Sequence, residues 1–503
     1  MIALVAQEPA AHVVAFDWLR LAPALAPAAG ALLVLLVDAL VPRRRLVHVL
    51  VAVVALLAGA VAAVPGALAA ADEPSVTLCL PGGSEGACLW SAGPIASTLQ
   101  IGLLAASLAA LLMLVDRWRD HSHDAVVDTA LVLASASGGV AVVAARELGT
   151  WLVALELATV PVVALVALRG TVRGAHGAVS LLMTSLLSFA LLVVGAGLWL
   201  TATGNPTLTG PAVRVAWADP DQRALLVVAV LVLLAGIGFK LSLVPFHAWT
   251  PPAFTGGPLP VSALLASASK LAAIGALLVV LEPFAHLVDP HPHAIAFVVG
   301  TLAITSMLVG TVVAYRTRDL VRLLAWSTIA QAGWVVLPLA ALSTTGHRAA
   351  AGYALTYAAA GLVAFAAATA LRSVDDGEPG SERGLAAYRG LARSHPHIGG
   401  PLILALLTLA GLPPGILGLV AKVVAIRPLL GAGLWPLAVL AVVAVILGIA
   451  VYVRWIAVLL SAPEPVAGHE VHLGRGAVAV LALGTALLVV ASAVPQVLYG
   501  LLS

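Results

Sequence analysis

The three lysines of this 503-residue chain all lie inside apolar segments, whereas its 22 arginines lie in loops or near segment ends. The lysines are Lys240, Lys270 and Lys422. A lysine near the centre of a bilayer costs about 2.5–3.5 kcal/mol on an insertion scale, so three cost on the order of 8 to 10 kcal/mol. An amine held away from water can release a proton near neutral pH, which arginine cannot do. This division predicts interior groups that load and release protons.

Glu156 is the best candidate for the carboxylate partner of one of these lysines. It lies in the middle of the apolar segment 151–168, while Glu147 lies near the end of that segment and is expected to be solvated. Opposite charges a few ångströms apart stabilise each other, and separating them lets the lysine give up its proton. Such a pair can act as an electrostatic gate. The spacing does not say which lysine Glu156 faces, and a fixed ion pair that only holds helices together is the alternative.

Two of the lysine-bearing segments contain residues that break helices. Pro245 follows Lys240, and the sequence Gly-Leu-Pro-Pro-Gly at 411–415 precedes Lys422. Proline removes a backbone donor and clashes with the preceding turn. Irregular backbone at membrane depth is tolerated only inside protein or beside water. Two broken helices in corresponding halves are typical of inverted-repeat ion pathways, although an ordinary proline kink explains either one alone.

His247 is a further candidate for a proton relay. It lies seven residues after Lys240, about two helical turns away and on nearly the same face if the break at Pro245 does not rotate it. Histidine titrates near physiological pH, and a packed or interfacial side chain is the alternative. Other polar side chains in the apolar segments can order water between the charges or simply bond neighbouring helices. They are Ser242, Thr250, Ser267, Ser269, Gln331, Tyr353, Tyr357 and Thr408.

The elements that must position these residues are membrane-spanning helices. Hydrophobic residues make up 62% of the chain, charged residues 10%, and the mean hydropathy is +1.09, far from the composition of soluble domains. Apolar runs of about 20 residues, enough to cross ~30 Å of hydrocarbon as a helix, recur throughout, whereas a membrane barrel would alternate apolar and polar residues. We therefore expect an all-α polytopic membrane protein. Its fourteen expected spans are 22–41, 47–66, 95–115, 125–145, 150–168, 176–200, 224–248, 258–281, 294–315, 321–343, 349–371, 398–426, 434–459 and 476–501.

The arginines predict the orientation. With the N-terminus outside, sixteen arginines fall in cytoplasmic loops and six on the outer side, in agreement with the positive-inside rule. The six outer arginines are Arg20, Arg146, Arg214, Arg223, Arg348 and Arg427. Both termini are then expected on the outer side of a bacterial inner membrane. The longest cytoplasmic loop, 372–397, is expected to be a solvated connector. The first fifteen residues carry no Lys or Arg before the apolar core, so a cleaved signal peptide is not expected.

The two cysteines, Cys79 and Cys88, flank a turn-rich stretch in the loop 67–94. The topology places this loop outside, where an oxidising compartment permits a structural disulfide, with two free thiols as the alternative. We find no glycine-rich nucleotide loop, no cysteine cluster for iron and sulfur, and no paired-histidine haem signature. We therefore expect no cofactor and no redox centre in this chain.

Several stretches of the chain together resemble the signature of the antiporter-like membrane subunits of respiratory complex I, the proton-pumping NADH:quinone oxidoreductase. Subunit N is the most similar form, because position 422 holds Lys where subunit M typically has Glu, and the chain lacks the C-terminal extension typical of subunit L. The resemblance is specific over about residues 125–430. Gln331 and Trp326 stand where the family commonly has His and Tyr, so Gln331 is expected to order water rather than titrate. The stretches are Phe-Lys-Leu-Ser-Leu-Val-Pro-Phe-His-Ala-Trp-Thr-Pro (239–251), Gly-Pro-Leu-Pro-Val-Ser-Ala (257–263), Ser-Lys-Leu-Ala (269–272), 322–333 and 409–422.

The resemblance implies a fold with two inverted five-helix repeats, at 125–281 and 294–459. Residues 1–124 then supply three N-terminal helices, and 476–501 the C-terminal helix. It also implies roles by position. Glu156 and Lys240 would form a coupled gate, Lys270 would be a relay on the central axis, and Lys422 would be the relay on the outward side.

The function implied is proton translocation coupled to electron transfer from NADH to quinone. NADH, flavin mononucleotide, iron–sulfur clusters and quinone would be bound by partner subunits. The expected partners are the adjacent antiporter-like and small membrane subunits and the lipid bilayer, with no nucleic acid. One alternative is a subunit of a multisubunit sodium (cation)/proton antiporter, which uses the same fold without redox chemistry. A purely structural membrane scaffold is the third possibility.

Overall fold

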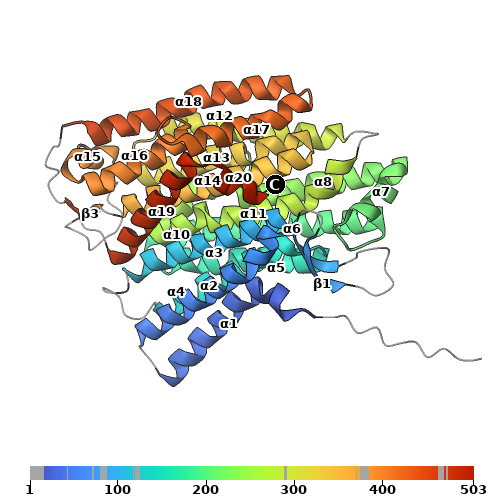
Figure 1. Ribbon diagram of the computed structural model, residues 1–503, viewed down its shortest axis with the longest axis horizontal. Coiled ribbons are helices and arrows are strands. Elements are labelled where there is room, and N and C mark those ends of the chain that lie inside the picture. Colours follow the sequence, from blue (N-terminus) through green and yellow to red (C-terminus); the bar gives the residue numbers. More distant parts are fainter. Residues whose placement is uncertain are drawn as a thin grey trace, which may run out of the picture.

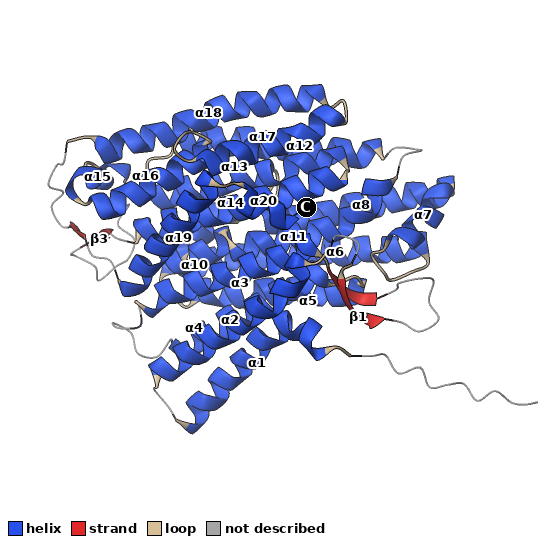
Figure 2. Cartoon of the chain, viewed as in Figure 1, coloured by secondary structure: helices blue, strands red, loops and turns tan. Residues whose placement is uncertain are grey.

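The helices of this chain are described by a computed structural model (Figure 2). It describes residues 16–41, 44–70, 73–79, 88–116, 118, 125–287, 292–369, 371–373, 384–462, 469–471 and 474–502. The expectation of an all-α polytopic fold is confirmed, since the described strands form only two short antiparallel pairs.

The helices follow the order of the expected spans. The N-terminal helices are α1 (Trp18–Leu40), α2 (Arg45–Leu68) and α3 (Pro94–Val115). They are followed by α4 (Ala125–Ala144), α5 (Leu148–Ala167), α6 (Val172–Thr203), α7 (Gly210–Ala218), α8 (Pro220–Leu241), α9 (Thr250–Gly256), α10 (Leu259–Ala266) and α11 (Ala268–Leu281). The next group is α12 (His293–Arg316), α13 (Leu320–Val336), α14 (Thr344–Ala368), α15 (Leu391–Ser394), α16 (Pro396–Ala410), α17 (Ile416–Gly431) and α18 (Trp435–Leu460). The chain closes with α19 (Arg475–Ala493) and α20 (Gln496–Tyr499), and short 3-10 turns are η2 (Glu282–His286), η3 (Leu337–Ala341), η4 (Leu385–Tyr388) and η5 (Gly500–Leu502).

Polar caps fix where many of these helices begin. A side-chain oxygen one residue before a helix accepts hydrogen bonds from the free N–H groups of the first turn. Proline at the first helical position needs no such partner. The capping residues are Asp17 for α1, Glu147 for α5, Thr171 for α6, Asp219 for α8, Asp319 for α13 and Ser343 for α14, and proline opens α3, α8 and α16.

Thirteen helical segments among the described residues are long and apolar enough to cross a membrane. The remaining expected span, 398–426, is divided between α16 and α17, neither of which is long enough alone. The helices run roughly along one direction, with α1 and α2 at one edge of the bundle and α18 at the other (Figure 1).

The core of the bundle is formed by α10, α11, α13 and α14. In these spans 83–94% of the residues in the apolar window are buried, against 28–33% in α1, α2, α18 and α19. The peripheral helices expose leucine and valine instead of polar residues, as expected where lipid is the solvent. Side chains held in the central helices are therefore remote from lipid.

Both expected helix breaks are present. Helix α8 ends at Leu241, where Ser242 adopts a left-handed conformation with φ of 65°. Helix α16 ends at Ala410 and is followed by Gly411, whose φ of 77° is a conformation that favours glycine. A third break, at Ser267 between α10 and α11, was not predicted, because residues 261–274 around it contain neither proline nor glycine.

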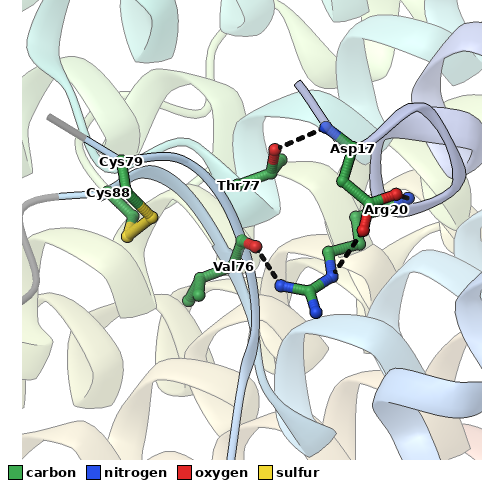
Figure 3. Close-up of a disulfide and its surroundings, with 6 residues drawn as sticks. All are labelled: Asp17, Arg20, Val76, Thr77, Cys79 and Cys88. Carbon is green, nitrogen blue, oxygen red and sulfur yellow. Dashed lines mark hydrogen bonds and ion pairs between the residues drawn. A yellow bond between two sulfur atoms is a disulfide. The ribbon is translucent and has the colours of Figure 1, made fainter. Parts of the chain in front are cut away.

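A disulfide-linked hairpin closes one end of the bundle. Strand β1 (Ser75–Cys79) pairs with β2 (Cys88–Ala92) in an antiparallel register that places Cys79 opposite Cys88, and a disulfide joins them (Figure 3). Arg20 donates to the carbonyl oxygen of Val76 and pairs with Asp17. The hairpin is thereby fixed to the start of α1, and we call this side of the molecule the hairpin end.

The prediction of a wholly solvated connector at 372–397 is wrong for its second half. Leu385, Tyr388 and Leu391 are buried, and the hydroxyl of Tyr388 donates to the carbonyl oxygen of Ala368 at 3.1 Å. Three apolar side chains spaced three residues apart can cover the end of the bundle. This spacing was overlooked in the sequence because the residues before it are mostly charged or polar. Of the first half, 371–373 forms strand β3 (Leu371–Ser373), which pairs with β4 (His469–Val471), and 374–383 lies outside the described residues.

Candidate functional site

Lys240 and Glu156 form a buried ion pair. The Nζ atom of Lys240, in the last turn of α8, lies 2.7 Å from Oε1 of Glu156 in the middle of α5. Lys240 is only 7% exposed, and the side chain of Glu156 is 18% exposed. The structure thus brings together the two residues that the resemblance pairs.

Two hydroxyl groups complete the surroundings of the Lys240 ammonium. Its Nζ donates to Oγ1 of Thr159 at 3.1 Å and to Oγ of Ser185 at 2.8 Å. The hydroxyl of Ser185 also lies 3.4 Å from Oε2 of Glu156. All three donor protons of the ammonium are therefore used, and the two hydroxyls remain as acceptors if the carboxylate moves away.

Lys270 lies in the first turn of α11 and contacts the broken end of α8. Its Nζ donates to the backbone carbonyl oxygen of Lys240 at 2.9 Å and to Oγ of Ser242 at 2.6 Å. Thr250 donates to the same Oγ at 2.7 Å. The ammonium also lies 4.9 Å from the ring centroid of Trp249, within the range of a cation–π contact. The break in α8 is what frees the carbonyl of Lys240 to accept this bond.

Lys422 contacts the second helix break in the same manner. Its Nζ donates to the carbonyl oxygens of Leu409 at 2.8 Å and Ala410 at 2.6 Å, which the end of α16 leaves without helical partners. The ammonium lies 5.5 Å from the ring centroid of Trp334, and Lys422 is 4% exposed. Neither Lys270 nor Lys422 forms an ion pair with a described carboxylate.

A polar network centred on Gln331 continues from Lys422. Its Nε2 donates to the hydroxyl of Tyr452 at 2.9 Å and lies 3.4 Å from the carbonyl oxygen of Leu409, the same oxygen that Lys422 contacts. The hydroxyl of Tyr353 donates to Oε1 of Gln331 at 2.8 Å. Gln331 on α13 therefore connects its own helix to α14, α16 and α18, and links two tyrosines to the carbonyl beside Lys422.

Small cavities adjoin the first and the last of the three lysines. One, of about 10 Å³, is lined by Lys240, Thr159 and Ser185. The other, also about 10 Å³, is lined by Lys422, Gln331 and Tyr452. Both are at the lower limit for one water molecule with polar partners. A single ordered water at each site would give the amine a partner for proton exchange.

His247 does not share a helical face with Lys240, because α8 ends six residues before it. Its ring lies 5.2 Å from that of Trp326 on α13. Within the described part of the chain, no hydrogen bond joins His247 to Lys240 or Lys270. The spacing argument for a relay at His247 therefore fails, since it assumed an uninterrupted helix.

Some polar residues of the site were not singled out in the sequence. Thr159 lies three residues after Glu156 on α5, so helical periodicity could have found it. Ser185 and Tyr452 gave no local signal, because serine and tyrosine in apolar helices are usually packing residues. Conversely, Ser267 and Thr408 bond carbonyl oxygens of their own helices, at Ala263 and Leu404. No group of three or more His, Cys, Asp or Glu suited to a metal occurs among the residues that the structure describes.

A family model supports the assignment of this site to a known class of membrane proteins. The model described as "NADH:quinone oxidoreductase/Mrp antiporter, TM" matches residues 145–448. The match includes all three lysines and Glu156.

Curated relatives are similar over almost the whole chain. A protein of Streptomyces griseus named NADH-quinone oxidoreductase subunit N 2 is 36% identical over 473 residues, covering 92% of this chain and 86% of the relative. The Salinispora tropica protein named NADH-quinone oxidoreductase subunit N is 38% identical over 469 residues, covering 89% and 86%.

Solved structures share the fold. A chain of respiratory complex I from Thermus thermophilus superposes with a TM-score of 0.76 at 27% identity, covering 96% of this chain and 99% of that one. A chain of the Mrp complex from Dietzia sp. superposes with a TM-score of 0.80 at 19% identity, covering 97% and 96%. At 19% identity the second likeness concerns the fold alone.

Proposed function

The chain belongs to the NADH:quinone oxidoreductase/Mrp antiporter transmembrane family, among its subunit N members, and on that premise we propose that it carries protons across a bacterial inner membrane. It does so as a membrane subunit of NADH:quinone oxidoreductase. The redox cofactors and quinone are bound by partner subunits, and adjacent antiporter-like and small membrane subunits flank this chain. The single observation that carries the proposal is the buried ion pair between Lys240 and Glu156.

The proposed mechanism starts from that ion pair. Quinone reduction in a partner subunit changes the electric field at Glu156 and draws its carboxylate away from Lys240. The ammonium, held only by the hydroxyls of Thr159 and Ser185, then passes its proton to water. The proton continues past Lys270 to Lys422 and leaves on the outer side. When the carboxylate returns, the neutral amine of Lys240 takes a proton from water on the cytoplasmic side, and the ion pair forms again.

The energies are compatible with this scheme. Moving one proton against ~100 mV requires about 2.3 kcal/mol. Two unit charges 2.7 Å apart attract each other by about 6 kcal/mol at an effective dielectric constant of about 20. The attraction within the ion pair therefore exceeds the energy needed to move one proton, even after the partial solvation of Glu156 is allowed for.

Two inverted repeats, at 125–281 and 294–459, are part of the proposal, as is the placement of both termini outside. The repeat relation is supported by the similar sites around Lys240 and Lys422. Each lysine adjoins a helix break and a cavity of about 10 Å³. Irregular backbone in corresponding halves is typical of ion pathways at repeat interfaces.

A subunit of a multisubunit cation/proton antiporter is the second candidate, because the description of the matching family model also covers Mrp antiporters. The identities of 36% and 38% to proteins named subunit N favour the first. The neighbouring genes discriminate between them. Genes for quinone and flavin subunits support NADH:quinone oxidoreductase, and genes for small cation-exchange subunits support the antiporter.

Replacement of Lys240 by Met in the assembled complex tests the proposal. The complex is reconstituted in vesicles, and protons pumped are measured together with NADH oxidised. We expect proton pumping per NADH to fall sharply, because methionine keeps the side-chain length without a titratable group. Arg223→Met, at the opposite end of the same helix, is the matched control and should pump normally. Normal pumping by Lys240→Met would refute the mechanism.

A further inference from the structure

A large groove at the hairpin end is not used by the proton pathway. It has a volume of about 980 Å³ and lies between the start of α14, the end of α17 and α20. Its lining includes Arg348 on α14, Arg427 on α17 and Gln496 on α20. We call it the Arg348–Arg427 groove.

The groove has a positive charge that no described carboxylate neutralises. Both arginines are exposed, and neither forms an ion pair with a described Asp or Glu. Arg348 also borders an adjoining cavity of about 340 Å³ whose carboxylate, Glu282, is engaged with Arg146 at 3.5 Å. The N-terminal turn of α14, with Ser343 and Thr345 on the groove wall, adds the positive end of a helix dipole.

The wall formed by α17 faces away from the proton pathway. Val420, Val424, Arg427 and Gly431 line the groove, and their spacing of four, three and four residues places them on one helical face. Lys422 lies two residues from Val420, about 200° around the helix, and points to the carbonyls of α16 instead. The groove is therefore separate from the cavity beside Lys422.

The groove adjoins apolar surface of the kind that faces lipid. Leu419, Val423 and Leu430 on α17 are 42%, 60% and 38% exposed. Val420 and Val424 continue this surface into the groove. A ligand that fits must therefore combine a negative head with an apolar tail, and two arginines of fork-like geometry suit phosphate oxygens.

We propose that the Arg348–Arg427 groove binds an anionic phospholipid. The phosphate lies between the two guanidinium groups at the start of α14, and an acyl chain lies along Val420 and Val424 of α17. The lipid then links α14 to the end of α17, the helix that carries Lys422. A protein partner is less favoured, because an unneutralised pair of arginines beside lipid-exposed leucine and valine matches a lipid headgroup and tail without any further assumption.

Lipid retention by the full-length chain tests this site. The chain is purified in detergent and incubated with phosphatidylglycerol or with phosphatidylcholine of the same acyl chains, and bound lipid is counted by native mass spectrometry. We expect selective retention of phosphatidylglycerol. The double variant Arg348→Gln/Arg427→Gln should weaken it about 25-fold, from roughly fivefold for each basic residue. Arg348→Lys/Arg427→Lys should retain most of the selectivity and shows that the site is otherwise intact.

Arg214→Gln/Arg223→Gln is the matched control, because it removes two arginines from the same end of the molecule outside the groove. It should change retention less than twofold. Equal loss in this control, or undiminished retention in the groove variant, would overturn the proposal. Competition by inorganic phosphate as strong as that by the lipid would also overturn it, since the apolar wall would then contribute nothing. The proposal would also be overturned if the groove variant lost a neighbouring subunit from the complex while its lipid retention stayed unchanged. The groove would then be a binding site for a protein.

Discussion

Replacement of Glu156 by Gln isolates the contribution of the charge pair, because it removes the carboxylate while preserving side-chain shape. The lost partner lies 2.7 Å from Nζ of Lys240. The Coulomb attraction at this distance is about 6 kcal/mol at an effective dielectric constant of about 20. Removal of one partner of a buried pair typically costs about 3–5 kcal/mol. The 18% exposure of the Glu156 side chain favours the lower end of that range.

An energy of this size predicts a large kinetic effect. If the pair supplies about 3–5 kcal/mol to proton transfer, its loss slows the transfer by about two to four orders of magnitude. Thr159 and Ser185 still accept hydrogen bonds from the ammonium, so the chain should fold and assemble. The assay measures proton uptake into vesicles that contain the reconstituted complex, relative to the NADH oxidised. We expect pumping to fall to a few per cent or less.

Two further variants make this test specific. Glu282→Gln is the matched control, because the Glu282 side chain is 56% exposed and lies 3.5 Å from Arg146 at the hairpin end; it should pump normally. The double variant Glu156→Gln/Lys240→Met should be no worse than the poorer single variant, since residues that act as a unit are not additive. Pumping of the Glu156→Gln complex at the unaltered rate, or additive losses in the double variant, would refute the reasoning.

Three more predictions concern the elements that position the site. Gly418→Ala should separate α16 from α17 and lower pumping, because an added Cβ would meet the carbonyl oxygen of Thr408 without room. Gly400→Ala, on the partner helix α16 but with nothing close to the added Cβ, is the control, and equal activity of the two variants would contradict the packing argument. Tyr452→Phe removes the hydroxyl that accepts a hydrogen bond from Gln331 and bonds Ser327. The free energy of unfolding should therefore fall by about 1–3 kcal/mol, as measured by thermal unfolding in detergent. An unchanged melting temperature would argue against the network. Cys88→Ser should destabilise the hairpin by about 2–3 kcal/mol, because the disulfide no longer limits the unfolded chain by closing a loop of nine residues. Protease cleavage between the strands measures this loss. In the native chain, both thiols should alkylate only after reduction.

The sequence predicted the residue types of the site better than their contacts. The three lysines, Glu156 and the helix breaks near Pro245 and 411–415 were all visible as costly residues in apolar segments. Each of these features is expensive in a membrane, and such costs can be read along a chain without knowledge of the fold.

The contacts between helices could not be predicted from the sequence. Glu156 and Lys240 are 84 residues apart, and only the resemblance suggested that they pair. The carbonyl partners of Lys422 carry no sequence signal of their own, since any residue before a helix break leaves its carbonyl free. The spacing of His247 from Lys240 was uninformative for a related reason, because the left-handed Ser242 ends α8 before the helical periodicity reaches His247.

A variant that keeps the positive charge at position 240 but cannot release a proton tests the central claim most directly. Lys240→Arg keeps a cation within reach of Glu156, but a guanidinium stays protonated in proteins. In the reconstituted complex, the ratio of protons pumped to NADH oxidised should fall as far as it does in Lys240→Met, while assembly is preserved. A Lys240→Arg complex that pumps at the normal ratio would contradict the account, because the interior cation would then act without giving up its proton.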